Sequence, residues 1–286
     1  MVKKIIGKSY IYLILLLMYL PVLVLIAFSF TEATNVGEWT GFSFNLYSRL
    51  FQDKQIMTAL ANTIIIAFIS ASVSVLLGVS GAIGSFYSSK KMRKAVDSVT
   101  QIPIVNAEIV MALSLTVMFV FLGNYIFKQN LFGFWTLLIG HVVLSLPFVY
   151  ISVKPKLQQM DPSLYEAAID LGATPKQALW KVIIPEIVPG IISGFLLAVT
   201  LSLDDFIITA FTRGSGLLNG EGKIETLSTL VQAKIKKGPI PPEMRALTTI
   251  IFLLVFIGVI TISISNYVKT KNTSKLKLRR RLHEKN

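Results

Sequence analysis

Three carboxylates stand inside stretches of sequence that are otherwise uncharged. Glu108 is the one charged residue in 98–127, and Asp204 and Asp205 are the only charged residues in 187–212. An acid at the centre of a bilayer costs roughly 2.5–3.5 kcal/mol, so such residues face a polar cavity or a partner. A path lined by carboxylates suits a cation, which on these residues alone is Na⁺, H⁺ or an organic cation. The alternative is that the acids form hydrogen bonds or ion pairs within the protein.

The two aspartates are not expected to do the same work. Adjacent residues of a helix point about 100° apart, so Asp204 and Asp205 cannot both face one cavity directly. We expect one to line the path and the other to be held by a neighbouring group. Their distance from Pro189 places them in the outer half of their span, whereas Glu108 falls in the inner half of its own.

Other chemistry is limited by the residue types present. The chain has no cysteine, which excludes disulfides and thiol-ligated metals. Its two histidines, His141 and His283, are far apart in the sequence, and His141 is expected to be a satisfied polar group in a helix rather than a proton relay. No phosphate-binding loop of the GxxxxGK[ST] type occurs, so the chain cannot hydrolyse ATP by itself. We predict a protein that is not an enzyme and that holds no metal or cofactor of its own.

The elements that position these residues are membrane helices. Of the 286 residues 53% are hydrophobic and 15% charged, and the mean hydropathy is +0.66. A bilayer core of about 30 Å is crossed by roughly 20 apolar helical residues. The sequence therefore predicts an all-α polytopic membrane protein with six spanning helices. They are expected within residues 9–30, 55–89, 98–127, 129–153, 187–212 and 246–268.

The net positive charge of the chain is explained by the side of the membrane on which its basic residues are expected to lie. The chain carries 28 Lys and Arg against 15 Asp and Glu, a net charge of +13. With both termini in the cytoplasm, most basic residues fall on the cytoplasmic side, as the positive-inside rule requires, although the outer segment 213–245 is also basic. The basic tail 269–286 is expected to meet anionic lipid. Nucleic acid is not expected as a partner.

A stripe of small residues follows the start of the fifth span. Gly190, Gly194, Ala198 and Ser202 recur every four residues. Such stripes let helix backbones approach closely, and we expect close packing against a helix of this chain or of a companion subunit.

The cytoplasmic segment 154–187 carries strong local signals for two short helices. Asp161-Pro162 is typical of a helix start, and Gly172 of a helix end. Thr174-Pro175 starts a second helix, which is expected to end before Pro185. The result is a helix-turn-helix elbow.

The elbow carries residues suited to docking. Ala167 and Ala168 are small enough to allow close approach of another protein, and Glu166 beside them can meet a basic or amide group. The alternative is a plain connector, which would need neither two helices nor such length. A DNA-reading role is excluded because the elbow lies between two membrane spans.

Residues 166–185, EAAIDLGATPKQALWKVIIP, resemble the EAA signature of binding-protein-dependent ABC importer permeases, which share the MetI-like fold. Glu166, Ala167, Ala168, Gly172 and Pro185 stand at the signature positions. The resemblance implies that the elbow is the coupling helix that sits in a groove of a cytoplasmic ATPase. It covers residues 58–268, beginning with the Asn62-Thr63 pair typical of this family.

Two further stretches resemble permeases of spermidine/putrescine importers. SLDDFIITAFTRGSG, residues 202–216, is similar to their Ser-x-Asp-Asp-Phe stretch, and PEMRALTTI, residues 242–250, to a second stretch that has Asn where this chain has Arg245. The resemblance implies that the cation is a polyamine. From their place inside apolar stretches, we expect Asp204, Asp205 and Glu108 to line the substrate path.

The resemblance also implies an assembly. We expect an anchor helix and first outer loop in 1–57, a transmembrane domain in 58–268 and a cytoplasmic tail in 269–286, in a bacterial cytoplasmic membrane. Partners would be a companion permease, an ATPase dimer that binds ATP and Mg²⁺, an external polyamine-binding protein and membrane lipid. The alternatives are a permease for ferric iron or an oxyanion, and a self-sufficient secondary transporter or channel for cations.

Overall fold

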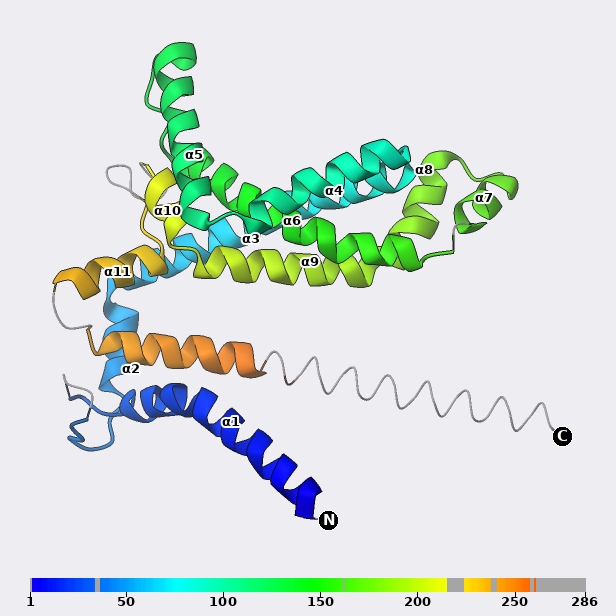
Figure 1. Ribbon diagram of the computed structural model, residues 1–286. Coiled ribbons are helices and arrows are strands. Elements are labelled where there is room, and N and C mark those ends of the chain that lie inside the picture. The colour runs from blue at the N-terminus through cyan, green and yellow to red at the C-terminus, as the bar shows by residue number, and fades with distance from the viewer. Residues whose placement is uncertain are drawn as a thin grey trace. The chain divides into compact units, whose positions relative to one another are not determined.

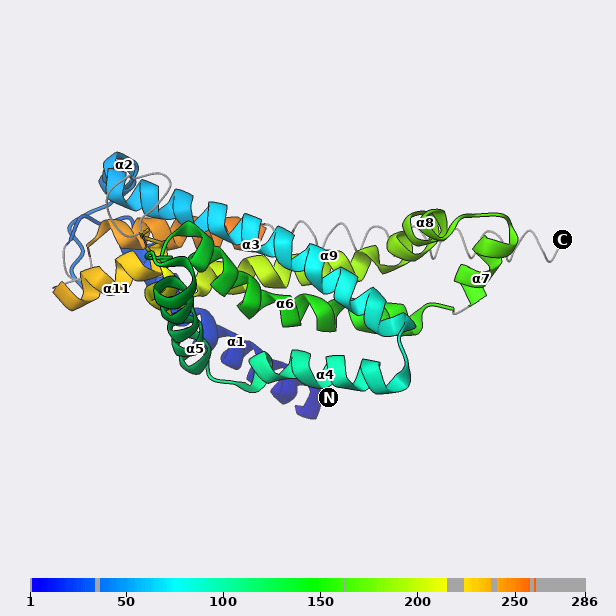
Figure 2. The same cartoon turned by 90° about the horizontal axis from the view of Figure 1, so that it is seen from above.

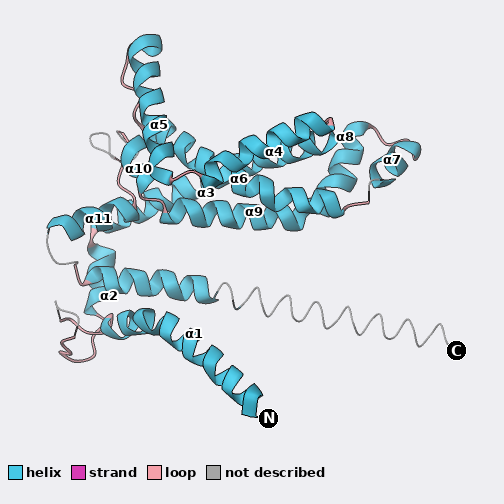
Figure 3. Cartoon of the chain, in the orientation of Figure 1, coloured by secondary structure: helices cyan, strands magenta, loops and turns pink. Residues whose placement is uncertain are grey.

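The computed structural model describes residues 2–33, 37–161, 163–214, 224–237, 241–257 and 260. Within these ranges the chain is built of helices joined by loops and contains no β-strand (Figure 3). It divides into two compact units, Gln55–Lys236 and the two terminal segments Met1–Lys54 and Lys237–Asn286. The all-α expectation is therefore confirmed.

Five helices in the described residues are long and apolar enough to cross a membrane, which agrees with a multi-pass membrane protein. These candidate spans are Ser9–Phe28, Lys54–Tyr87, Glu108–Phe127, Phe134–Gln159 and Pro175–Asp204. Residues 243–257 are also helical and cover the first part of the predicted sixth span. Except for residue 260, the rest of that span lies outside the described residues, as does the predicted basic tail 269–286.

The terminal unit contains α1 (Val2–Phe28), α2 (Asn45–Gln52) and the helix 243–257 (Figure 1). The Phe30 ring stacks on the Phe42 ring and meets the Phe44 and Tyr47 rings, which closes the loop between α1 and α2. Arg245 is buried and donates hydrogen bonds to the backbone carbonyl oxygens of Phe28 and Ala33. The Arg that departs from the family pattern thus ties the helix 243–257 to the end of α1.

The central unit carries the predicted functional residues. Its elements are α3 (Lys54–Tyr87), α4 (Lys90–Val105), α5 (Glu108–Phe121), the π-helical turn η1 (Leu122–Phe127), α6 (Phe134–Gln159), α7 (Ser163–Asp170), α8 (Pro175–Ala178), the π-helical turn η2 (Leu179–Ile183), α9 (Ile184–Asp204), α10 (Ile207–Thr212) and α11 (Leu227–Lys237). Figures 1 and 2 show α3, α6 and α9 running side by side, with α7 and α8 beyond one end and α10 and α11 at the other.

The small-residue stripe of α9 packs against α6. A Cβ atom on Gly190 would lie 2.9 Å from the Ser152 carbonyl oxygen, and one on Gly194 would lie 3.1 Å from the Val149 Cα atom. Ala198 and Ser202 are buried on the same stripe. The expectation of close packing is confirmed, and the partner is a helix of this chain.

We predict that Gly190→Ala destabilises the purified chain by about 1–3 kcal/mol, because its methyl group would press on backbone atoms of α6. Gly84→Ala is the control, since a Cβ atom there meets nothing within 4 Å. Thermal unfolding in detergent measures both. Equal unfolding temperatures for Gly190→Ala and wild type would contradict the packing described above.

Two of the predicted spans are interrupted. The span expected within 98–127 is Glu108–Phe127, which is not continuous with residues 98–105, because Asn106 and Ala107 have extended backbones and α5 leaves α4 at a steep angle (Figure 1). The span expected within 187–212 begins earlier, at Pro175, and stops at Asp204, before α10 begins at Ile207. Both breaks occur within apolar sequence, so hydropathy alone gave no sign of them.

The second elbow helix does not end before Pro185. It continues from Pro175 to Asp204, and the π-helical turn η2 ends at Ile183, two residues before that proline. Proline lacks an N–H donor and its ring crowds the preceding turn. A π-helical turn changes the local hydrogen-bond pattern, so it accommodates the proline without ending the helix.

Candidate functional site

The elbow is closed by hydrogen bonds between near neighbours. The Asp161 carboxylate accepts from the backbone N–H of Ser163 at 3.0 Å, which lowers the pKa of Asp161. At the end of α7, Gly172 has φ +85° and its N–H donates to the Ile169 carbonyl oxygen, while Ala173 donates to the Ala168 carbonyl oxygen. These bonds form the C-terminal motif that glycine favours. The predicted start and stop of the first elbow helix are confirmed.

The start of the second elbow helix is a capping box. The Thr174 hydroxyl accepts from the Gln177 N–H, and the Gln177 side chain accepts from the Thr174 N–H. Both bonds satisfy donors that a helix start leaves free. The elbow is therefore a defined element and not a loose connector.

The elbow exposes the residues predicted to dock. Glu166 and Ala167 are exposed and Ala168 is half-buried, and no hydrogen bond or ion pair joins the Glu166 side chain to other described residues. Leu171 and Trp180 are 89% and 66% exposed, an apolar surface that sequence reasoning missed. The exposed surface of the elbow thus combines a carboxylate with small and large apolar side chains.

The elbow is attached to the helical bundle through an aromatic contact and a buried side chain. The Tyr165 ring of α7 lies 5.5 Å from the Tyr87 ring at the end of α3, measured between centroids. Ile183 of η2 is fully buried in one core cluster with Leu157 and Ile187. A displacement of the elbow would therefore act on α3, α6 and α9 together.

A polar cluster joins α3, α4 and α6 near the end that carries the elbow. The Asp97 carboxylate of α4 accepts from Lys154 Nζ at 2.5 Å and from the Tyr150 hydroxyl at 2.7 Å. Tyr150 also contacts the Ser85 hydroxyl of α3 at 2.9 Å. Burial acts to raise the pKa of Asp97, but the bonds from Lys154 and Tyr150 outweigh it, and the pKa lies below the ordinary aspartate value.

We predict that this cluster weakens in acid. A carboxyl whose pKa is lowered by folding stabilises the fold above its unfolded pKa, and this contribution is lost as the pH falls through the folded pKa. The pair is partly exposed, so the loss is about 1 kcal/mol or less. Hydrogen exchange over 90–105, corrected for its intrinsic pH dependence, should accelerate in acid in wild type and not in Asp97→Asn. The same acid response in both proteins would contradict the prediction.

The structure gives the two neighbouring aspartates different surroundings. Asp205 is buried, and its carboxylate accepts from the backbone N–H groups of Ile208 at 3.1 Å and Thr209 at 2.8 Å. Asp204, the last residue of α9, is exposed and makes no hydrogen bond or ion pair through its side chain with other described residues. The expectation that one aspartate of the pair is held by neighbours is confirmed for Asp205.

Glu108 is not brought to the aspartates by any direct bond. It is the first residue of α5, directly after the break at Asn106 and Ala107, and it is exposed. Within the described ranges, no hydrogen bond or ion pair joins it to Asp204 or Asp205. The structure thus separates the three acids into one buried and two exposed carboxylates.

His141 is a satisfied buried group, as predicted. Its Nδ1 atom lies 2.7 Å from the Ser202 hydroxyl and its Nε2 atom 2.9 Å from the Thr209 hydroxyl. The ring therefore connects the last turn of α9 with α10. No group of three or more His, Cys, Asp or Glu side chains that could hold a metal ion is found in the part of the chain that the structure describes.

The Asn62-Thr63 pair holds the segment before α11. The Asn62 amide donates to the Glu225 carbonyl oxygen at 2.9 Å, and the Thr63 hydroxyl accepts from the Leu227 N–H at 2.8 Å. Sequence reasoning had noted the pair but assigned it no contact. Its role in this structure is to anchor the start of α11.

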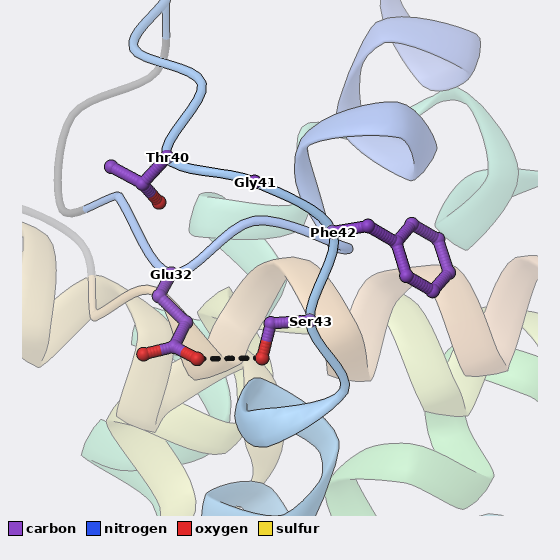
Figure 4. A pocket seen from close by; sticks show the side chains of 5 residues that line it. All are labelled: Glu32, Thr40, Gly41, Phe42 and Ser43. Atoms are coloured by element: carbon purple, nitrogen blue, oxygen red, sulfur yellow. Dashed lines mark hydrogen bonds between the residues drawn. The ribbon is translucent and has the colours of Figure 1, made fainter.

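A cavity of about 450 Å³ in the terminal unit is lined by Glu32, Thr40, Gly41, Phe42 and Ser43. Figure 4 shows Glu32 bonded to Ser43 and the Phe42 ring turned away from both. Hydrogen bonds from Ser43 and Asn45 lower the pKa of Glu32. The Glu32 carboxylate thus accepts hydrogen bonds from within its own loop.

A family model defines the class of protein to which this fold and elbow belong. Residues 74–271 match the family "Binding-protein-dependent transport system inner membrane component". The chain belongs to this family, and it is a permease subunit of an ABC importer rather than an enzyme.

Individual relatives extend the match over most of the chain. The spermidine/putrescine transport system permease protein PotC of Haemophilus influenzae is 32% identical over 86% of this chain and 91% of that protein. The putrescine transport system permease protein PotI of Escherichia coli K12 is 34% identical over 82% of this chain and 81% of that protein.

Solved structures share the fold. A chain of a bacterial ABC transporter involved in the import of the acidic polysaccharide alginate has a TM-score of 0.68 at 18% identity, over 93% of this chain and 96% of that chain. The same type of transporter, in complex with an alginate pentasaccharide-bound periplasmic protein, gives a TM-score of 0.67 at 19% identity, over 89% and 90%.

Proposed function

We propose that this chain is a permease subunit of an ATP-driven polyamine importer and forms half of its translocation path. The observation that carries the proposal is the similarity to spermidine/putrescine and putrescine permeases over most of the chain. The exposed Asp204 supports it, since a carboxylate that bonds to none of the other described side chains suits a cationic substrate. Glu108, also exposed, is a second candidate for the path.

The assembly we propose contains a companion permease, an ATPase dimer and an external polyamine-binding protein. The capped, exposed elbow with Glu166 supports an ATPase partner, which would bind ATP and Mg²⁺. A related fold has been solved with a periplasmic protein, which supports an external delivery protein. The subunit would lie in the bacterial cytoplasmic membrane, in contact with its lipids.

We further propose six spans with both termini in the cytoplasm. Lys90, Lys91 and Lys94 are exposed in the first part of α4, and α4 begins near the end of the bundle that carries the elbow (Figure 1). Clusters of basic residues favour the cytoplasmic side. An elbow that meets a cytoplasmic ATPase requires the same orientation.

The mechanism that follows is alternating access. Closure of the ATPases on ATP displaces the elbow, and the Tyr165–Tyr87 contact and the buried Ile183 transmit the displacement to α3, α6 and α9. The path opens outward, and the cation passes from the binding protein to Asp204. An oxyanion substrate would be repelled there, and a self-sufficient cation transporter would have no use for an exposed elbow.

Purification of the tagged chain with its neighbours tests the proposed assembly. We expect a stable complex with a second permease and an ATPase, whose hydrolysis is stimulated by a spermidine-loaded binding protein. Recovery of the chain alone, with cation transport driven by an ion gradient, would support the secondary transporter instead.

A further inference from the structure

The break between α9 and α10 lies inside a stretch of apolar sequence and needs internal hydrogen bonds. Asp205 has an extended backbone there, with φ −62° and ψ 126°. The first N–H groups of α10 would lack partners in a membrane, where water cannot replace them. The Asp205 carboxylate uses one oxygen for the Ile208 N–H and the other for the Thr209 N–H. The break is therefore capped by Asp205.

A chain of polar groups runs across the same break. The hydrogen bonds link Ser70, Ser202, His141, Thr209 and Asp205 in that order. The Thr209 hydroxyl donates its one hydrogen to Asp205 Oδ2, so it accepts from His141 Nε2. At the other end of the chain of bonds, His141 Nδ1 lies 2.7 Å from the Ser202 hydroxyl, which accepts from the Ser70 hydroxyl. The bonds thus connect α3, α6, α9 and α10 across the break.

Asp205 is also tied to the segment that follows. Its backbone carbonyl oxygen accepts from the Ser228 hydroxyl of α11 at 2.6 Å. The side chain of Asp204, one residue earlier, makes no hydrogen bond with the rest of the described chain. Because Asp204 precedes Asp205 directly, the hydrogen bonds that fix Asp205 also fix the backbone of Asp204.

We infer that Asp205 is a positioning residue: with His141 and Thr209 it holds the break between α9 and α10 and so sets the place of Asp204. This inference rests on the proposed function, in which Asp204 meets the cation. It predicts that the two neighbouring acids have separate roles. A substitution that removes the hydrogen bonds of Asp205 should slow transport because it displaces Asp204.

A double-mutant cycle tests the inference in the reconstituted importer at saturating spermidine-loaded binding protein. Thr209→Val removes the hydroxyl between His141 and Asp205, and we expect it to lower the maximal uptake rate by roughly two- to tenfold. Asp204→Asn should lower it further, and the double variant should be no slower than Asp204→Asn alone. Thr200→Val is the matched control, because the Thr200 hydroxyl is exposed and, among the described residues, donates to the Leu196 carbonyl oxygen of its own helix and to no other group.

A second measurement does not depend on transport. The chain has no cysteine, so Asp204→Cys provides a single thiol whose modification rate by a charged thiosulfonate reports its placement. Thr209→Val and Asp205→Asn should each change that rate at least about twofold, and Thr200→Val should not. An unchanged modification rate of Asp204→Cys would overturn the positioning role. So would a double variant, Thr209→Val with Asp204→Asn, whose uptake falls by the product of the two single-variant factors. Full uptake in Asp204→Asn would instead overturn the proposed path, while the labelling rate would still decide the placement.

Discussion

Glu166→Lys leaves the permease folded and inserted but lowers ATP-driven uptake by more than about tenfold. Glu166 is exposed and bonded to no other described side chain, so its replacement removes nothing that holds the elbow together. A partner that presents a basic group to it would meet a like charge, which costs several kcal/mol. Uptake by vesicles, together with ATP hydrolysis and the yield of purified complex, measures the effect.

The control for this charge change is Lys94→Glu. Lys94 is exposed near the same end of the bundle but lies on α4 rather than on the elbow. We expect it to retain uptake. If Glu166→Lys transports at the wild-type rate, the elbow does not couple this subunit to an ATPase.

Asp204→Asn lowers polyamine uptake by at least about tenfold without loss of assembly. The side chain is exposed and makes no hydrogen bond or ion pair within the described chain, so the folded protein loses no internal bond. A hydrogen bond to a charged group contributes roughly 1.5–3 kcal/mol, and the amide would no longer offset the charge of the substrate. Initial rates with radiolabelled spermidine and putrescine, normalised to the amount of complex, measure the loss.

Asp204→Glu is the control because it keeps the charge on a side chain one methylene longer. It should retain more uptake than Asp204→Asn. Equal rates for wild type and Asp204→Asn would remove Asp204 from the path, and Glu108 would then be the exposed acid to test.

The elbow could be predicted from the sequence because its signals are local. Asp161, Gly172 and Thr174 each bond to backbone within five residues, so residue type and spacing were sufficient. The continuation of its second helix through Pro185 could not be foreseen, because the π-helical turn that accommodates the proline has no mark in the sequence.

The acidic site could be predicted only in part. We predicted different surroundings for Asp204 and Asp205 from the geometry of a continuous helix, but α9 ends at Asp204. Which aspartate is buried depends on the break before α10 and on His141, which lies more than 60 residues earlier. The Asp97 cluster was missed for the same reason, since Lys154 and Tyr150 meet Asp97 only when α4 packs on α6. Contacts between distant segments decided what local patterns left open.

Uptake by the reconstituted complex tests the central claim most directly. The chain, its companion permease and the ATPase are placed in proteoliposomes with the binding protein outside, and radiolabelled spermidine is followed with and without internal ATP. We predict accumulation that requires ATP, that unlabelled putrescine competes for and that Na⁺ and K⁺ at equal ionic strength do not. Accumulation without ATP, or no accumulation of either polyamine with an active ATPase, would contradict the account.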